Sequence, residues 1–170
     1  AMGTFISQST KIYDRATGKV NGFEALLRWH HPQQGLVMPS EFIPLAEETG
    51  LIVPLGEWVL RTACAEAAKW PAHVRIAVNL SPAQFRSKEL VPVVIGALAS
   101  SGVAPHRLEL EVTETVIMHD SEAVFAVLGQ LRELGVRIAL DDFGTGYSSL
   151  SFLQKFPFDK IKIDRSFVNE

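Results

Sequence analysis

The feature that most constrains the fold is an alternation along the chain between short runs rich in β-branched residues and amphipathic runs of helical length. Strands are expected at 5–13, 20–29, 74–80, 107–113, 136–140 and 158–163. The turn-like residues 16–18 favour an antiparallel hairpin between the first two. The later alternation requires parallel strands with crossover helices, in an open sheet or one curled into a barrel.

Helices are expected between these strands. Ser40 is predicted to cap a helix that ends at Gly50, and Asp120 to cap one that ends at Gly135. Further helices are expected at 55–70 and 89–100, with a short one after Ser148. About six strands are present, whereas an eight-stranded barrel needs about 250 residues, so a barrel in these 170 residues would be incomplete.

Composition narrows the class of protein. A hydrophobic fraction of 47% with 21% charged residues is typical of one globular domain with a sizeable core. The formal net charge of -3 argues against binding a long nucleic acid. Cys64 is the only cysteine, which favours a reducing, cytoplasmic compartment. Residues 91–98 are too few to cross a bilayer, so no direct membrane insertion is expected.

Polar side chains lie within or directly after the predicted strands, where a sheet covered on both faces should be apolar. Each alone has an ordinary explanation as a turn residue, a helix cap or a solvent-facing side chain. Five successive strands nevertheless each deliver an oxygen ligand or a lysine toward the C-terminal edge of the sheet, where α/β proteins place their sites. The residues are Glu24, Asn79, Glu111, Asp141, Asp142 and Lys162.

The five oxygen-bearing residues suit Mg²⁺ or Mn²⁺ better than zinc, because no paired histidine accompanies them. Two such ions can stabilise the attacking and leaving oxygens of a phosphoryl displacement. Lys162 could orient the attacking water. The same carboxylates and lysine would also suit a lyase or isomerase that stabilises an enolate. His30 and His31 precede Pro32 in a turn and are poor metal candidates.

Together these residues resemble the EAL domain family, named after a motif that stands here as Glu24-Ala25-Leu26. The motif alone is too short to be specific, but it comes with an ordered set of others: 28–32, 79–82, 109–114, 141–149 and 160–164. The resemblance covers roughly residues 13–168. It implies a TIM-like (β/α) barrel with one antiparallel strand that hydrolyses cyclic di-GMP to linear pGpG with Mg²⁺ or Mn²⁺, and that calcium inhibits.

The resemblance also assigns roles to residues. Glu24, Asn79, Glu111 and Asp141 would bind metal, Asp142 would engage the second metal, and Lys162 would position the hydrolytic water. Glu24, Asp142 and Lys162 are therefore the expected catalytic residues. Arg28 and Asp164 are expected to contact the substrate, a role that a guanidinium suits at a phosphate. Glu114 would hold the loop 142–149, which the family couples to a dimer interface.

Two departures from the family pattern stand out. A substrate-contacting glutamine is usual in the first strand, but Thr10 and Lys11 stand at its place, and Gln8 could replace it only across a bulge. Residues 1–3 resemble a cloning remnant, and 4–170 an EAL domain that lacks its C-terminal strands. Weak or absent hydrolysis by this chain is therefore expected.

The remaining alternative is a non-catalytic EAL module that binds cyclic di-GMP or a protein partner. A homodimer is expected, with sensor or diguanylate cyclase domains fused to it in a parent protein.

Overall fold

The computed structural model describes residues 4–14, 16–119, 121–144 and 151–163. Its strands are β1 (Thr4–Tyr13), β2 (Val20–His31), β3 (Gly35–Val37), β4 (Arg75–Asn79), β5 (Leu108–Thr113), β6 (Arg137–Phe143) and β7 (Lys160–Ile163). The helices are α1 (Pro39–Glu48), α2 (Ile52–Ala67), α3 (Pro82–Arg86), α4 (Leu90–Ser101), α5 (Glu114–His119), α6 (Ser121–Glu133) and α7 (Ser151–Lys155), with a 3₁₀ turn, η1 (Pro105–Arg107).

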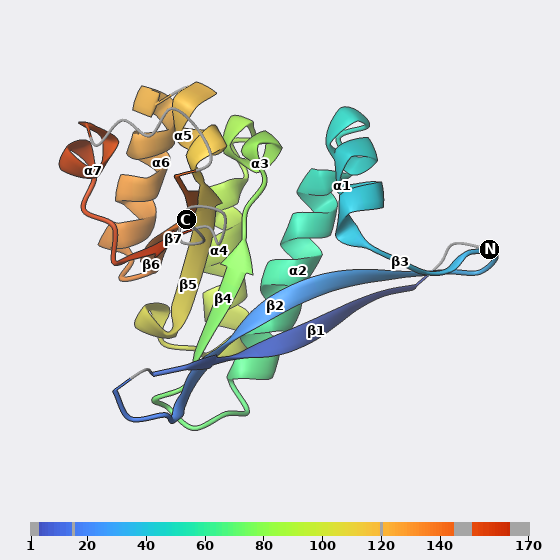
Figure 1. The fold of residues 1–170 in the computed structure, drawn as a ribbon, viewed down its shortest axis with the longest axis horizontal. Coiled ribbons are helices and arrows are strands. Elements are labelled where there is room, and N and C mark those ends of the chain that lie inside the picture. The colour runs from blue at the N-terminus through green and yellow to red at the C-terminus, as the bar shows by residue number, and fades with distance from the viewer. Residues whose placement is uncertain (1–3, 15, 120, 145–150, 164–170) are drawn as a thin grey trace.

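The strands form one curled sheet in the order β1-β2-β4-β5-β6-β7, with β3 paired to β2 (Figure 1). β1 runs antiparallel to β2, and each later pair along the path is parallel. Among the described residues, no pairing of β7 with β1 closes the sheet. The predicted α/β fold, an incomplete TIM-like barrel with one antiparallel strand, is therefore confirmed.

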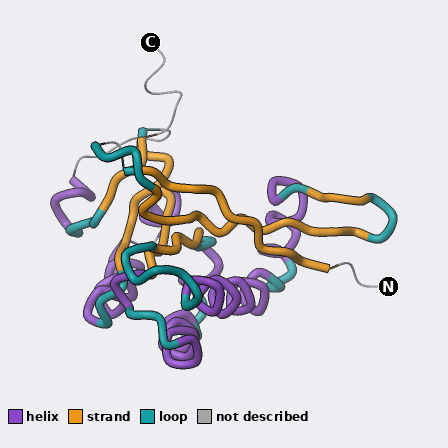
Figure 2. The backbone as a smooth tube through the Cα atoms, turned by 90° about the horizontal axis from the view of Figure 1, so that it is seen from below, coloured by secondary structure: helices purple, strands orange, loops and turns teal. Residues whose placement is uncertain are grey.

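The two faces of the sheet have different chemistry because side chains alternate along each strand. One face is apolar and packs against helices, which Figure 2 shows gathered mostly on one side of the strands. Its fully buried members include Ile76, Leu108, Leu110, Ile138 and Leu140. The intervening positions of β4 to β7 face the inside of the curl and carry most of the charged and amide side chains of these strands, with the small residues Ala77 and Ala139 between them. The hydrophobic core therefore lies outside the curl, and the polar residues lie within it.

The structure corrects the start of the first helix. α1 begins at Pro39, and its N-cap is Met38, so the prediction that Ser40 caps it is wrong. Proline suits the first helical position because its ring fixes φ and its missing N–H is not needed there. The carboxylate of Glu41 accepts a hydrogen bond from the Met38 N–H at 3.2 Å, which holds this end.

Other elements differ in extent or were not predicted. α2 begins at Ile52 rather than residue 55, because Pro54 is tolerated in a first helical turn. The short elements β3, α3 and α5 were not predicted, although Ser81, Pro82 and Gln84 form a capping box with a proline at the first position of α3. Asp120, predicted as a cap, lies outside the described residues.

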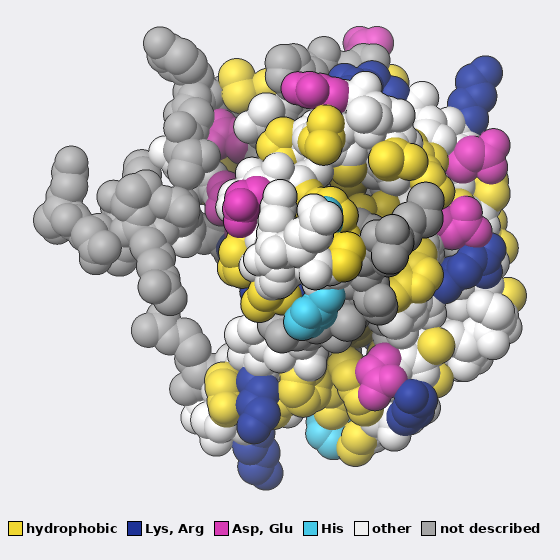
Figure 3. All heavy atoms as spheres, turned by 90° about the vertical axis from the view of Figure 1, so that its right-hand side faces the viewer, with side chains coloured by type: hydrophobic (Ala, Val, Ile, Leu, Met, Phe, Trp, Pro, Cys, Tyr) yellow, Lys and Arg dark blue, Asp and Glu magenta, His cyan; other side chains and the backbone are white. Residues whose placement is uncertain are grey.

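The far end of β2 and the strand β3 extend away from the body of the sheet, past α1 (Figure 1). At their turn the ring nitrogen Nδ1 of His31 accepts hydrogen bonds from the backbone N–H groups of Gln33 and Gln34, at 3.3 and 3.2 Å. His31 thus closes a turn. On the face that carries this end, hydrophobic and charged side chains are interspersed (Figure 3). In the described part of the chain, no helix is long and apolar enough to cross a membrane.

Candidate active site

The predicted site residues come from five strands, on the polar inner face of the curl. Glu24 lies in β2, Asn79 ends β4, Glu111 lies in β5, Asp141 in β6 and Lys162 in β7. Asn79 stands opposite Glu111 in the parallel ladder, and Asp141 stands opposite Thr113. This stagger brings side chains far apart in the sequence to one level of the sheet.

The ammonium group of Lys162 lies at the centre of the group. Its Nζ donates to Oε2 of Glu111 at 2.7 Å and to Oδ2 of Asp141 at 2.8 Å. Oε2 of Glu24 lies 3.9 Å from the same nitrogen. On the other side of Glu24, Oε1 accepts a hydrogen bond from Nδ2 of Asn79 at 2.8 Å. Three carboxylates therefore surround one cation, and the cluster keeps an excess of negative charge.

Burial and hydrogen bonding shift the pKa values of Glu111 and Lys162 in opposing ways. Desolvation raises the pKa of Glu111 to about 6, although the hydrogen bond and the charge of Lys162 work in the opposite direction. Burial also acts to lower the pKa of Lys162, but its hydrogen bonds to Asp141 and Glu111 outweigh burial and hold that pKa above its ordinary value. Lys162 is therefore a permanently charged donor at neutral pH.

The chain is irregular at Asp141 and Asp142. The pairing of β6 with β7 shifts register between Leu140 and Phe143, so that these two aspartates stand where the partner strand supplies only Lys162. Asp142 has a positive φ of 54°, and its backbone N–H donates to Oδ1 of Asp141 at 2.9 Å. The bulge places two adjacent aspartates opposite Lys162, where a regular strand would present a single residue.

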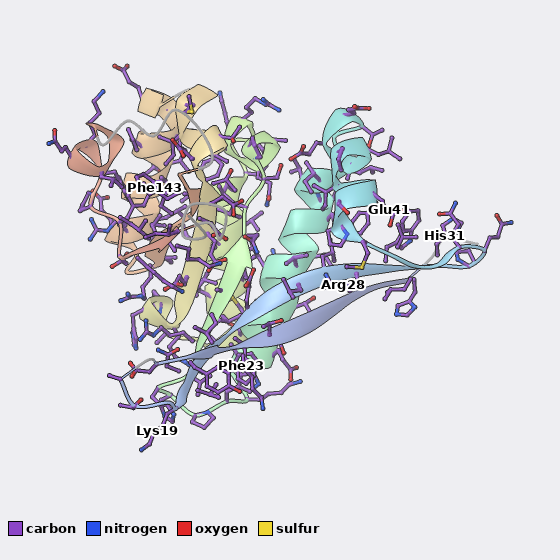
Figure 4. All side chains as sticks on the ribbon, viewed as in Figure 1. Lys19, Phe23, Arg28, His31, Glu41 and Phe143 are labelled. Atoms are coloured by element: carbon purple, nitrogen blue, oxygen red, sulfur yellow. The ribbon has the colours of Figure 1, made fainter. Side chains whose placement is uncertain are left out.

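The other predicted residues lie at varying distances from this centre. Oε2 of Glu114 accepts a hydrogen bond from the Gly144 N–H at 3.4 Å, where the predicted loop begins. Arg28 lies on the part of β2 that extends past β4 (Figure 4). Its guanidinium donates a hydrogen bond to the carbonyl of Leu27 at 2.7 Å. Asp164 and most of the loop 142–149 lie outside the described residues.

The donor set fits a hard divalent cation. Oε1 of Glu111 is buried and makes no hydrogen bond to any residue that the structure describes, so an acceptor is left over at the centre of the site. All the candidate ligands are oxygens, as Mg²⁺ and Mn²⁺ prefer. In the described part of the chain, however, no three acidic, histidine or cysteine side chains already converge as metal ligands. Lys162 lies among them, so a bound ion would share the carboxylates of Glu111 and Asp141 with its ammonium.

A cavity of about 290 Å³ adjoins the site, between β2, α1, α2 and the start of α3. Its walls are mostly apolar, with Leu26, Ile43 and Leu55 among them, and Asn79 of the candidate site also lines it. Glu47 of α1 also lines it and accepts a hydrogen bond from the hydroxyl of Ser81, which caps α3. Sequence reasoning missed Glu47, because an acid near the end of an amphipathic helix is ordinarily solvent-exposed.

The sequence and structure of this chain are similar to those of known proteins. The family model of the EAL domain matches residues 6–170. The chain is 52% identical over 157 residues to the bifunctional diguanylate cyclase/cyclic di-GMP phosphodiesterase MucR of Pseudomonas aeruginosa, covering 90% of this chain and 23% of MucR. It is 46% identical over 157 residues to the cyclic di-GMP phosphodiesterase NbdA of the same organism, covering 90% of this chain and 20% of NbdA.

A solved structure of similar form is that of the PaMucR phosphodiesterase in complex with c-di-GMP. It matches with a TM-score of 0.92 at 48% identity, over 98% of this chain and 69% of that one. The chain thus spans less than a third of the length of the two curated relatives, but about two thirds of the solved domain.

Proposed function

This chain belongs to the EAL domain family, and on that premise we propose that it hydrolyses cyclic di-GMP to linear pGpG with two Mg²⁺ or Mn²⁺ ions. One observation carries the proposal: carboxylates from three parallel strands surround a single cation position, and the cluster keeps an excess of negative charge. Relatives named cyclic di-GMP phosphodiesterases support the choice of substrate.

The ions would be held by Glu24, Asn79, Glu111, Asp141 and Asp142. When bound, they would acidify a water and stabilise the charge that develops on the phosphate. The protein's own contribution is positional. Carboxylates on rigid strands keep their spacing, and the bulge in β6 supplies two adjacent aspartates without breaking the sheet.

Lys162 would act as a hydrogen-bond donor. Because its pKa lies above the ordinary value, it keeps its proton at neutral pH and cannot serve as a general base. Its ammonium can instead orient the attacking water or offset charge on a phosphate oxygen. The proton released by the water would pass to a carboxylate of the cluster or to solvent.

The neighbouring cavity would take a guanine base. Its apolar walls can cover the faces of a purine, and the carboxylate of Glu47 can accept from guanine donors once its bond to Ser81 is exchanged. Arg28 lies on the same strand as Glu24 and would contact a phosphate.

We further infer a cytoplasmic location, homodimerisation and fusion to other signalling domains in the full-length protein.

The test is to incubate the chain with cyclic di-GMP and Mn²⁺, with EDTA or Ca²⁺ in parallel, and to separate pGpG by chromatography. Because weak hydrolysis is expected of this chain, we expect slow product formation with Mn²⁺ alone, and at least a hundredfold less for Glu24→Gln. The matched control is Glu57→Gln, which changes an exposed glutamate on α2 and should keep the original rate. Calorimetric binding of cyclic di-GMP without turnover would instead favour a non-catalytic binding module.

A further inference from the structure

A second charged layer lies inside the curl, directly below the candidate site. Nζ of Lys160 donates to Oε1 of Glu109 at 2.9 Å, and Nε of Arg137 lies 3.5 Å from Oε2 of the same carboxylate. Arg137 also lies 3.9 Å from Asp159. This layer, which we call the lower charge cluster, holds two acids and two bases and is electrically balanced. The site above it holds more acids than bases.

The two layers are built in the same way. Glu109 and Glu111 share one face of β5, and Lys160 and Lys162 share one face of β7, each pair two residues apart. In both layers a lysine of β7 reaches across β6 to a glutamate of β5. The rise along a strand separates the layers by roughly 6.6 Å.

Backbone pairing holds the residues on either side of Lys162, Ile161 with Leu140 and Ile163 with Phe143, and leaves the bulge opposite Lys162 itself. The ladder between β6 and β7 is regular at Lys160 and then shifts at the bulge, opposite Lys162. Below that point β7 is anchored: Asp159 both donates to the Ile138 carbonyl and accepts from the Ile138 N–H, each at 2.8 Å. Between these pairings, the contacts with Glu111 and Asp141 set where the Lys162 ammonium lies.

The buried charge of Glu109 makes it important which of the two lysines is its partner. The side chain of Glu109 is only 4% exposed, so its carboxylate needs a close cation. The contact with Arg137 is longer than a normal hydrogen bond, which leaves Lys160 as its main partner. Without Lys160, Glu109 would compete with the site carboxylates for Lys162.

We propose that Glu109 and Lys160 are positioning residues: their ion pair neutralises the lower layer and thereby reserves Lys162 for Glu111 and Asp141. The catalytic consequence rests on the proposed function, whereas the placement of Lys162 does not. A lower charge cluster that only stabilises the sheet would affect unfolding but not the surroundings of Lys162.

The experiment follows the Lys162 side chain by NMR in protein labelled with ¹³C- and ¹⁵N-lysine, assigned through Lys162→Met. Lys160→Met leaves Glu109 charged, and Glu109→Gln/Lys160→Met removes both charges. Lys160→Gln repeats the single change with a polar side chain should Lys160→Met not fold. Lys69→Met is the control, because it removes an exposed ion pair with Glu66 on α2. Thermal unfolding is recorded for every variant.

We expect the chemical shift of the Lys162 ammonium to change in Lys160→Met and Lys160→Gln. In the double variant and in the control it should equal that of the original protein. A signal unmoved in folded single variants, or displaced equally in single and double variants, would overturn the proposal. Turnover of cyclic di-GMP should fall about tenfold in the single variants and recover in the double. If the unchanged chain shows no turnover, the proposed function fails while the NMR result still decides the positioning role.

Discussion

Replacing Glu111 by glutamine should stabilise the metal-free protein at neutral pH while removing a candidate metal ligand. The Glu111 side chain is fully buried, and desolvation raises its pKa from 4.5 to about 6. Each tenfold change in proton affinity corresponds to about 1.36 kcal/mol, so keeping this carboxylate ionised in the folded state costs about 2 kcal/mol. The amide oxygen of glutamine can still accept from Lys162, at nearly the same volume.

The direction with pH follows from proton uptake. Between pH 4.5 and about 6, the folded protein holds a proton on Glu111 that the unfolded chain has lost. Stability therefore falls as the pH rises through this window and stays low above it. Because Glu111→Gln cannot ionise, it escapes this loss. Its advantage should be about 2 kcal/mol at pH 7.5 and should vanish near pH 4.

The assay is thermal and urea unfolding at pH 4 and pH 7.5 in EDTA. A gain of about 2 kcal/mol corresponds to a rise in Tm of roughly 4–8 °C for a chain of this size. Glu133→Gln, an exposed change on α6, serves as control and should stay within about 0.5 kcal/mol at both pH values. A variant no more stable than the original protein at pH 7.5, or equally stabilised at pH 4, would refute the reasoning.

Three further perturbations test other parts of the structure. Gly56→Ala should lower the free energy of unfolding in urea by about 1–2 kcal/mol, because the added Cβ would stand 2.1 Å from Nε2 of the buried Gln84. An unchanged unfolding midpoint would mean that Gln84 moves freely. Arg107→Met should cost about 2–4 kcal/mol, since the buried guanidinium donates to the carbonyls of Val74 at 2.9 Å and Ala67 at 2.7 Å; loss below 1 kcal/mol would contradict this. Mn²⁺ at about a hundred times its Kd should stabilise the protein by about 2.7 kcal/mol at pH 7.5. The stabilisation should be smaller at pH 5, because protons compete with the ion for the carboxylates. Equal stabilisation at both pH values would argue against carboxylate ligands.

Strand positions could be predicted because their signal is local. The runs that became β4, β5 and β6 carry apolar residues at alternate positions, and the structure places them within a few residues of the expected limits. The error at Ser40 has the same origin. A serine cap and a proline at the first helical position are competing local signals, and the backbone preference of Pro39 prevailed.

The contacts between side chains could not be predicted from the sequence in the same way. The contacts of Lys162 with Glu111 and Asp141 span 51 and 21 residues of sequence. They depend on the stagger of neighbouring strands and on a bulge in β6 that has no separate sequence signature. Glu109 was visible only as part of a motif, and its pairing with Lys160 emerged from the curl of the sheet.

The sequence by itself determined that acids, an amide and a lysine arrive in order on successive strands of a parallel sheet, because strand periodicity and chain order are local properties. Only the tertiary structure decided which of these charges meet. It places one lysine among three carboxylates and gives the other to a buried glutamate below, because the curl and stagger of the sheet bring β7 within reach of β2 and β5.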